Sequence, residues 1–220
     1  MPSGTTISAE RFSEFESSLA YFRATQTFEQ EIKVTIARGL KPLVLCEGET
    51  DPKYLIAACD ALGLTSLSST VDFEWIGRKA TDGSADGGGD KNLDSALRFL
   101  RNNPQFTTRT VVFLYDSDTK KPSADYGPLH VRTLPYIADH PKAIKGIENL
   151  LSPNAFEGKF YSPSEKLEGC DIVTRLKLNK VQLCAAVCSP PYNKKFFDNF
   201  RAPLEALVHL LLPIVAPHHG

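Results

Sequence analysis

The stretch VVFLYDSD, Val111 to Asp118, decides how the rest of the chain is read. Its first five residues form a continuous hydrophobic run, which is typical of a β-strand buried on both faces of a sheet. Asp116 and Asp118 stand two positions apart where this run ends. Residues two apart in a strand lie on the same side. The sequence therefore predicts two neighbouring carboxylates at the mouth of a buried strand.

The overall composition is that of a globular domain. The 220 residues include 25 Lys and Arg against 26 Asp and Glu, with 42% hydrophobic residues and a net charge of -1. This balance does not favour a strongly basic nucleic-acid binder, although bound metal ions could supply positive charge. We see neither a secretory signal nor a membrane-spanning apolar run. We therefore expect a soluble, cytoplasmic protein that does not insert into a membrane.

The cysteines do not form a recognisable metal-binding pattern. The chain has five cysteines at irregular spacings, and the close pair Cys184 and Cys188 has no histidine or further cysteine at zinc-ligand spacing. We interpret them as reduced thiols, several of them ordinary core residues.

Hydrophobic periodicity extends the prediction outward from the central strand. Helices are predicted over 8–38, 50–64, 93–103, 140–153 and 191–213, and strands over 42–48, 71–77, 109–116 and 129–137. Asp51 is the expected N-cap of the second helix, Pro52 its first residue and Gly63 its end. We expect the last helix to bend at Pro203. Residues 82–92 form a glycine-rich loop, and 155–180 give no clear pattern.

Strands that alternate with helices predict an α/β fold, a three-layer sandwich with a mainly parallel sheet and additional N- and C-terminal helices. We divide the chain into an N-terminal helical region (1–40), a catalytic core (41–152), and a mixed segment with the C-terminal helix (153–220). Ligands of such sheets bind beyond the carboxyl ends of the strands. Glu47, Asp116 and Asp118 all follow predicted strands at that end.

Glu47 follows the apolar run PLVLC and therefore needs a partner, because an isolated buried carboxylate is costly. An arginine is one such partner and a divalent cation is the other. Mg²⁺ and Mn²⁺ prefer hard oxygen ligands and would also hold Asp116 and Asp118 ionised together. The alternative for the aspartate pair is a solvated turn, and for Asp51 a simple helix cap.

Together these residues resemble a known family. The pattern E-G-x-x-D (Glu47, Gly48, Asp51) after one strand, followed by D-x-D (Asp116, Asp118) after a later strand, is similar to the TOPRIM domain of topoisomerases, primases and OLD-type nucleases. The segment KGIENLL, which contains Glu148, resembles an element that follows D-x-D in the OLD-type nucleases. Glu148 could equally be a surface glutamate. The resemblance covers roughly residues 40 to 150.

The resemblance implies a TOPRIM-like Rossmannoid fold and metal-dependent phosphodiester hydrolysis. Two Mg²⁺ or Mn²⁺ ions would activate a water and stabilise the leaving oxygen. Glu47 would act as a metal ligand and general acid/base. The implied metal ligands are Glu47, Asp51, Asp116, Asp118 and Glu148. A lysine could neutralise developing charge, and we select Lys91 in the glycine-rich loop as the catalytic candidate, with Lys120 and Lys121 behind it.

Other functions compete with a nuclease. Asp116 and Asp118 also resemble the nucleophile and acid/base of haloacid dehalogenase-like phosphatases, but the G-D-x-x-x-D segment (Gly89 to Asp94) precedes them, which is the wrong order for that fold. A glycosyltransferase D-x-D would leave Glu47 unexplained. An RNA-processing TOPRIM nuclease and a non-enzymatic TOPRIM interaction module remain alternatives. A primase is disfavoured because no zinc-binding cysteine cluster is present.

The expected partners follow mainly from the resemblance. OLD-type nucleases often carry an ATPase on the same chain, but no G-x-x-x-x-G-K-[ST] motif occurs here. We therefore expect a stand-alone TOPRIM effector, gated by a separate ATPase in antiviral (anti-phage) defence. Nucleic acid is the expected substrate, with DNA favoured over RNA. A homodimer could form through the C-terminal helix, whose alternative is to pack on the chain's own sheet.

Overall fold

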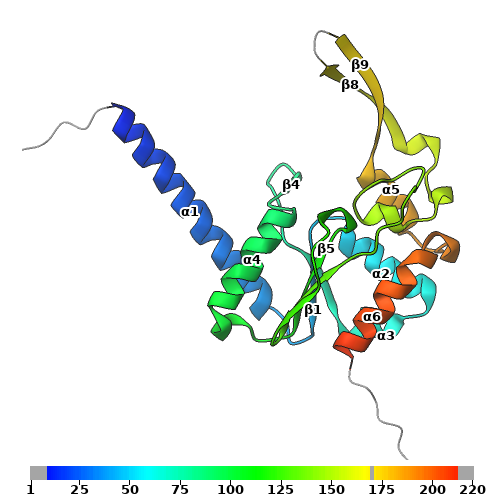
Figure 1. The fold of residues 1–220 in the computed structure, drawn as a ribbon, viewed down its shortest axis with the longest axis horizontal. Coiled ribbons are helices and arrows are strands. Elements are labelled where there is room, and N and C mark those ends of the chain that lie inside the picture. The colour runs from blue at the N-terminus through cyan, green and yellow to red at the C-terminus, as the bar shows by residue number, and fades with distance from the viewer. Residues whose placement is uncertain (1–8, 169–170, 213–220) are drawn as a thin grey trace, which may run out of the picture.

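A five-stranded, mostly parallel sheet forms the centre of the computed structural model, which describes residues 9–168 and 171–212 (Figure 1). The strands occur in the order β2-β1-β5-β7-β6, and only β6 runs antiparallel to its neighbour. Their bounds are β1 (Leu43–Cys46), β2 (Asp72–Trp75), β5 (Val111–Tyr115), β6 (Ala124–Tyr126) and β7 (Leu129–Thr133).

Helices cover both faces of this sheet. Residues of α1 (Ala9–Ala37) and α4 (Asp90–Asn102) share one hydrophobic core with the sheet. The other core is formed with α2 (Asp51–Leu62), α3 (Thr65–Thr70), α5 (Lys180–Val187) and α6 (Arg201–Leu211). The sheet therefore lies between two helical layers. The predicted α/β three-layer sandwich with a mainly parallel sheet and terminal helices is confirmed.

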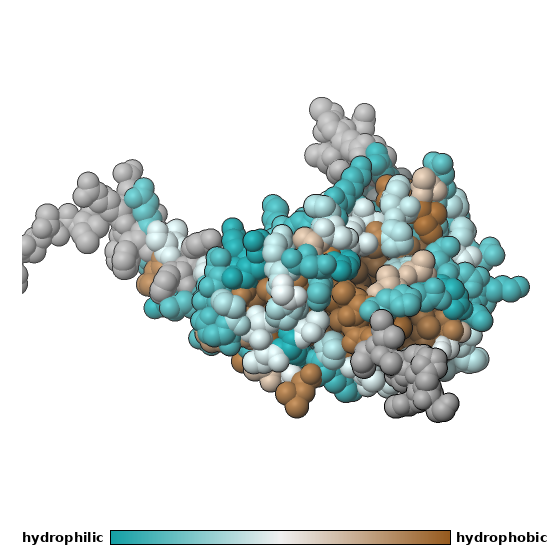
Figure 2. All heavy atoms as spheres, turned by 60° about the horizontal axis from the view of Figure 1, so that its bottom comes forward, coloured by the Kyte–Doolittle hydropathy of each residue, from teal (hydrophilic) through white to brown (hydrophobic). Residues whose placement is uncertain are grey.

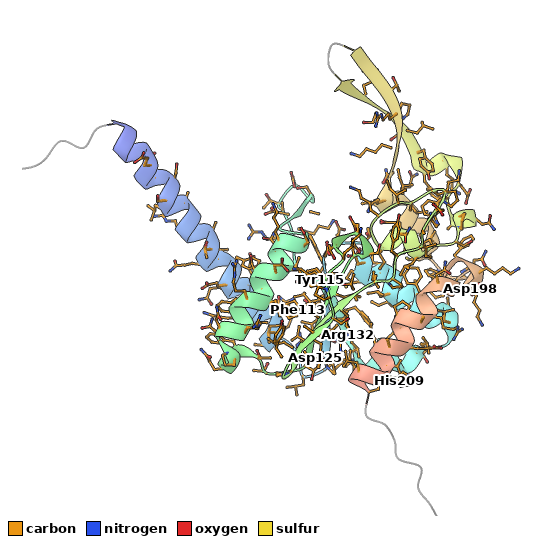
Figure 3. All side chains as sticks on the ribbon, viewed as in Figure 1. Phe113, Tyr115, Asp125, Arg132, Asp198 and His209 are labelled. Atoms are coloured by element: carbon orange, nitrogen blue, oxygen red, sulfur yellow. The ribbon has the colours of Figure 1, made fainter. Side chains whose placement is uncertain are left out.

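The central strand β5 shows why a continuous apolar run was needed. All five of its residues are buried. Val112 and Leu114 point into the core beneath α2 and α6, whereas Phe113 and Tyr115 point into the core beneath α1 and α4. Figure 3 labels Phe113 and Tyr115 beside α4, and the Tyr115 hydroxyl donates to Asp94 Oδ1 of α4 at 2.7 Å. Both faces of β5 are therefore packed in hydrophobic cores, and neither faces solvent.

Helix α2 begins and ends close to the predicted positions. Gly63 closes it with a φ of 76°, a left-handed conformation that favours glycine. Asp51 is the first helical residue rather than the N-cap, which is Thr50. The Asp51 carboxylate instead accepts a hydrogen bond from the backbone N–H of Gly48 at 2.6 Å. It therefore closes the turn that follows β1.

The helix predicted over 140–153 is wrong. This segment is irregular apart from a 3-10 turn at Ile147–Leu150. Gly146 has a φ of 76°, which interrupts a right-handed helix. The buried Asn149 side chain bonds the backbone N–H and C=O of Ile137 and the C=O of Ala143. A side chain that competes for backbone groups in this way favours a loop.

The C-terminal segment also differs from its prediction. Two 3-10 turns, Lys194–Phe196 and Asp198–Phe200, precede α6. Pro203 is the third residue of α6 and causes no bend, because the first-turn N–H groups have no partner within a helix. Leucines of α6 are buried in the chain's own core, so this face is not free for a homodimer. They are Leu204, Leu207 and Leu211.

Strand β6 was not predicted, although it pairs with β7 in a hairpin of the main sheet. Two further hairpins were not predicted either. One joins β3 (Arg78–Lys79) to β4 (Ala85–Asp86), and the other joins β8 (Tyr161–Glu168) to β9 (Asp171–Leu178). Figure 1 shows both at the same end of the molecule. β8 is mostly polar, and β3 and β4 have only two residues each, so neither hairpin shows the alternation that predicts a strand.

The surface is mainly hydrophilic in the view of Figure 2, with hydrophobic residues gathered in its right half. Within 9–168 and 171–212, no helix combines the length and the apolar character that a membrane crossing would require.

Candidate functional site

The first two acidic residues are brought together by sheet pairing. Strands β1 and β5 are parallel neighbours, with Cys46 opposite Leu114. Glu47 and Asp116 therefore leave the sheet at the same end. The backbone N–H of Asp116 donates to Glu47 Oε1 at 2.8 Å. This contact joins the two predicted motifs directly.

The glycine-rich loop supports the backbone of Glu47. The N–H of Gly89 donates to the Glu47 carbonyl at 3.0 Å. A Cβ added at Gly88 would lie 3.0 Å from the same carbonyl. The loop therefore approaches the protein's own backbone closely at this point, which a larger side chain would hinder.

A third carboxylate, Glu148, reaches the site from the loop after β7. It is 1% exposed, and its Oε2 accepts a hydrogen bond from Lys180 Nζ at 2.7 Å. A Cβ added at Gly146 would lie 2.7 Å from Glu148 Oε2, 2.8 Å from Lys180 Nζ and 3.7 Å from Asp116 Oδ2. Glycine at this position leaves room for all three groups. Its positive φ makes a substitution unfavourable for a second reason.

Asp118 lies at the rim rather than beside Asp116. The strand ends at Tyr115, and the chain then enters a 3-10 turn over Ser117–Thr119. Ser117 is buried and Asp118 is exposed, so Asp118 is no longer part of the strand. Both carboxylates nevertheless lie near Gly146, on the common side that the strand period predicts. Asp118 still faces the site, because its Oδ1 accepts a hydrogen bond from the Gly146 N–H at 3.4 Å.

We call Glu47, Asp51, Asp116, Asp118 and Glu148 the acidic cluster. Burial raises the pKa of Asp116 to about 7, with further increases from Glu47 and Glu148. Burial also raises the pKa of Asp51 well above its usual range, and Asp116 raises it further. The pKa of Glu47 is raised by burial as well. The fold therefore disfavours the ionised forms of these three carboxylates.

Lys180, the first residue of α5, is the lysine that the structure places against the acidic cluster. Burial acts to lower its pKa, but Glu148, Asp116 and Asp51 outweigh burial and raise it. Sequence reasoning missed this residue. It lies outside the three recognised motifs, in a helix that follows the unassigned segment, and no local pattern marks it.

Lys91, the sequence candidate, occupies a different environment. It is exposed in the first turn of α4, and its backbone N–H bonds Asp90 Oδ1. Within the described residues its side chain has no contact with the acidic cluster. Lys121 forms an ion pair with Asp94 and lies 4.4 Å from the centre of the Tyr115 ring. Lys120 is exposed.

The donor chemistry of the cluster fits a hard divalent cation. All its ligating atoms would be oxygens, which Mg²⁺ and Mn²⁺ prefer. Glu148 Oε1 is buried without a hydrogen-bond partner, and such an atom normally has one. In the part of the chain that the structure describes, no three His, Cys, Asp or Glu side chains converge closely enough to hold an ion as they stand. Binding would require side-chain movement, with Lys180 leaving Glu148 Oε2.

No protein-family model, curated protein or solved structure matches this chain. The site must therefore be interpreted from its own geometry and charge.

Proposed function

We propose that this chain is a metal-dependent phosphodiester hydrolase, a nuclease related to the TOPRIM domain. The observation that carries the proposal is the meeting of carboxylates from β1, α2, β5 and the loop after β7, with Lys180 as the cation in contact. Buried like charges repel one another. Such an arrangement is stabilised when a divalent cation binds it.

The residues divide into distinct roles. Glu47, Asp51, Asp116 and Glu148 would hold Mg²⁺ or Mn²⁺ from the protein side, with Asp118 at the entrance. Such ions, when bound, supply Lewis-acid stabilisation of a phosphoryl oxygen. Glu47 is suited to receive a proton from an attacking water. Burial raises its pKa above the usual value for a glutamate, which brings the pKa closer to neutral pH and makes the side chain a better general base. Lys180 is placed to neutralise the charge that develops on phosphate oxygens.

The finer parts of the proposal rest on the resemblance of the motifs. These parts are DNA as the favoured substrate, a cytoplasmic location, a role in antiviral defence, and control by a partner ATPase. An RNA-processing nuclease and a non-enzymatic interaction module use the same motifs. They differ from the proposed function in the substrate that is cleaved or in the absence of cleavage.

The test combines metal binding with cleavage. We expect isothermal titration calorimetry to detect Mn²⁺ binding to the purified chain, and Glu47→Gln and Asp116→Asn to weaken it at least about tenfold, which corresponds to loss of roughly 1.4 kcal/mol. We expect Mn²⁺-dependent cleavage of plasmid DNA or structured RNA to fall by at least about a hundredfold in both variants. Glu205→Gln, an exposed glutamate on α6, is the control.

The outcomes separate the alternatives. Turnover of small phosphomonoesters that requires Asp116 but not Glu47 would identify a phosphatase. Metal binding without cleavage of any nucleic acid would favour the interaction module. Cleavage that survives both Glu47→Gln and Asp116→Asn would show that the acidic cluster is not the active site.

A further inference from the structure

A pair of thiols lies on α5, outside the acidic cluster. Cys184 and Cys188 are both free, and their Sγ atoms lie 3.8 Å apart. Cys184 is 1% exposed, whereas Cys188 is only partly buried. Cys46 and Cys59 are buried in the hydrophobic core. Among the described cysteines, Cys188 is therefore the one that a dissolved reagent can reach, and a second thiol lies next to it.

The position of the pair at the end of a helix permits a disulfide. Residues four apart in an α-helix have Cα atoms about 6 Å apart, within the span of roughly 4.4–6.8 Å that disulfides bridge. The N–H of Cys188 donates to the carbonyl of Cys184 at 2.9 Å, so the two backbones keep this helical spacing. Cys188 is the C-cap of α5, and its side chain can turn without disturbing a following helical turn. The sulfurs need to approach by less than about 2 Å to reach bonding distance.

The contact between the sulfurs also separates the acidities of the two thiols. The neighbouring Cys188 thiol lowers the pKa of Cys184, although burial acts in the opposite direction. The same contact raises the pKa of Cys188. The pair therefore loses one proton readily and holds the other between the two sulfurs. A thiolate is the form of cysteine that attacks a disulfide.

The pair is connected to the acidic cluster through two helices. Cys184 Sγ lies 3.8 Å from the carbonyl oxygen of Thr50, within reach of a hydrogen bond from the thiol. Thr50 is the N-cap residue of α2 and stands immediately before Asp51. Along α5, Lys180, Cys184 and Cys188 are spaced four apart and therefore lie on one side of the helix. A change at the sulfurs is thus close to the acidic cluster on both α2 and α5.

We propose that Cys184 and Cys188 are a redox-active dithiol, which a low-molecular-weight disulfide oxidises to a Cys184–Cys188 disulfide, and that this oxidation withdraws Cys184 from Thr50 and loosens the start of α2. In reducing compartments such disulfides are usually transient and serve catalysis or redox sensing. The inference is independent of the proposed hydrolase activity, because it requires neither metal binding nor cleavage.

Glutathione disulfide is an oxidant of this class. The proton of Cys188 passes to the Cys184 thiolate, and the Cys188 thiolate attacks one sulfur of glutathione disulfide. An S–S bond forms between Cys188 and glutathione, the original S–S bond breaks, and one glutathione leaves. Cys184 then loses its proton to the solvent, attacks Cys188 Sγ and expels the second glutathione. Overall the two cysteines lose two electrons and two protons, and one disulfide molecule becomes two thiols.

The test follows one tryptic peptide of the full chain. Cleavage after Lys180 and Lys194 releases residues 181–194, which hold both thiols. The chain is equilibrated with glutathione disulfide, quenched with acid and alkylated in urea with iodoacetamide. The alkylated fraction of this peptide should fall at least about fivefold, and mass spectrometry should find the peptide lighter by two hydrogens. Dithiothreitol should restore its alkylation, and the peptides that carry Cys46 and Cys59 should stay alkylated throughout.

Hydrogen exchange followed by NMR checks the effect on α2. The amides of Lys53 and Tyr54 donate to the Thr50 carbonyl at 3.1 Å, and oxidation should make them exchange at least about threefold faster, because the contact from α5 is lost. Cys188→Ser keeps Cys184 but has no partner thiol, so the same treatment should produce neither the disulfide nor the faster exchange. Circular dichroism checks that this variant is folded, and the measurements on the unsubstituted chain do not depend on it.

Three results at the peptide would overturn the proposal. The first is a peptide that stays fully alkylated, and the second is one that carries glutathione without closing the disulfide. The third is a peptide linked to Cys170, which lies outside the described residues. Exchange at Lys53 and Tyr54 that does not change on oxidation would overturn the effect on α2.

Discussion

The two ends of the sheet treat buried charge in opposite ways. At the amino end, the Arg109 side chain is 1% exposed and bonds Asp72 Oδ2 at 2.5 Å, the Lys41 carbonyl at 3.1 Å and the Thr35 carbonyl at 2.7 Å. At the carboxyl end, the acidic cluster gathers several carboxylates against Lys180. At the amino end, the chain itself supplies the opposite charge. At the carboxyl end, the carboxylates outnumber the lysine that pairs with them, so a bound cation could supply the missing positive charge.

This difference separates a structural ion pair from a candidate binding site. Arg109 joins the end of α1, the start of β1 and the start of β2, so its bonds hold three elements in place. The acidic cluster gains little from its own contacts, because burial and mutual repulsion raise the pKa values of Asp116 and Asp51.

The largest expected effect is at the amino end. Arg109→Met should lower the free energy of unfolding by about 3 kcal/mol, since it removes a buried guanidinium and leaves two carbonyls and the partly exposed Asp72 carboxylate without their partner. Urea denaturation followed by circular dichroism measures it. Arg132→Met is the control, because its partner Asp125 is largely exposed; a loss as large as that of Arg109→Met would show that burial does not distinguish the two pairs.

At the carboxyl end of the sheet, we expect a substitution to stabilise the fold rather than destabilise it. In EDTA at pH 8, Asp116→Asn should raise the free energy of unfolding by about 1–2 kcal/mol, because it removes one of the repelling carboxylates. Asp198→Asn, an exposed aspartate labelled in Figure 3, should leave it unchanged. A loss of stability in Asp116→Asn would mean that the ionised side chain stabilises the fold.

The pH dependence of stability, compared between the unsubstituted chain and Asp116→Asn, tests the same explanation. Asp116 has a folded pKa of about 7, above the value of about 3.9 for an unfolded chain. The folded state therefore binds a proton first, and stability increases as pH falls from about 8 to about 5, by at most about 1.4 kcal/mol per pH unit for each proton taken up. Asp116→Asn should flatten this slope.

The smallest expected effect on stability is that of Lys180→Met, with Lys91→Met as its control. In metal-free protein, Lys180→Met should lower the free energy of unfolding by up to about 1 kcal/mol, because the half-exposed ammonium offsets the buried charge of Glu148. It should also move the pH range over which stability changes to higher pH, since Lys180 lowers the pKa of Asp116. Lys91→Met should do neither. Equal effects of the two substitutions in denaturation at several pH values would remove Lys180 from the cluster.

Much of the sheet could be predicted, because its strands depend on local patterns. The run VVFLY and the run LVLC have no polar residue that could face solvent, and parallel pairing of two such strands brings Glu47 and Asp116 to one end. Short elements were harder to predict. The two-residue strands β3 and β4 are too short for periodicity, and the apolar spacing over 140–153 resembled a helix although Gly146 and Asn149 favour a loop.

The same reasoning explains which site residues were found. Glu47, Asp51 and Asp116 follow or begin regular elements, so their positions could be predicted from sequence. Lys180 could not, because its contact with Glu148 spans 32 residues and a hairpin.

Helix α1 has a consequence that concerns the shape of the whole particle. Its 29 residues make it about 43 Å long, which is close to the diameter of a compact domain of this size. Its buried residues Ile32 and Ile36 lie near its C-terminal end, and Figure 1 shows the rest projecting from the body. The chain therefore tumbles as an asymmetric particle with a lever arm. The projecting part is therefore anchored to the body through the C-terminal end of α1, where Arg109 and Thr108 bond the carbonyls of Thr35 and Ile36.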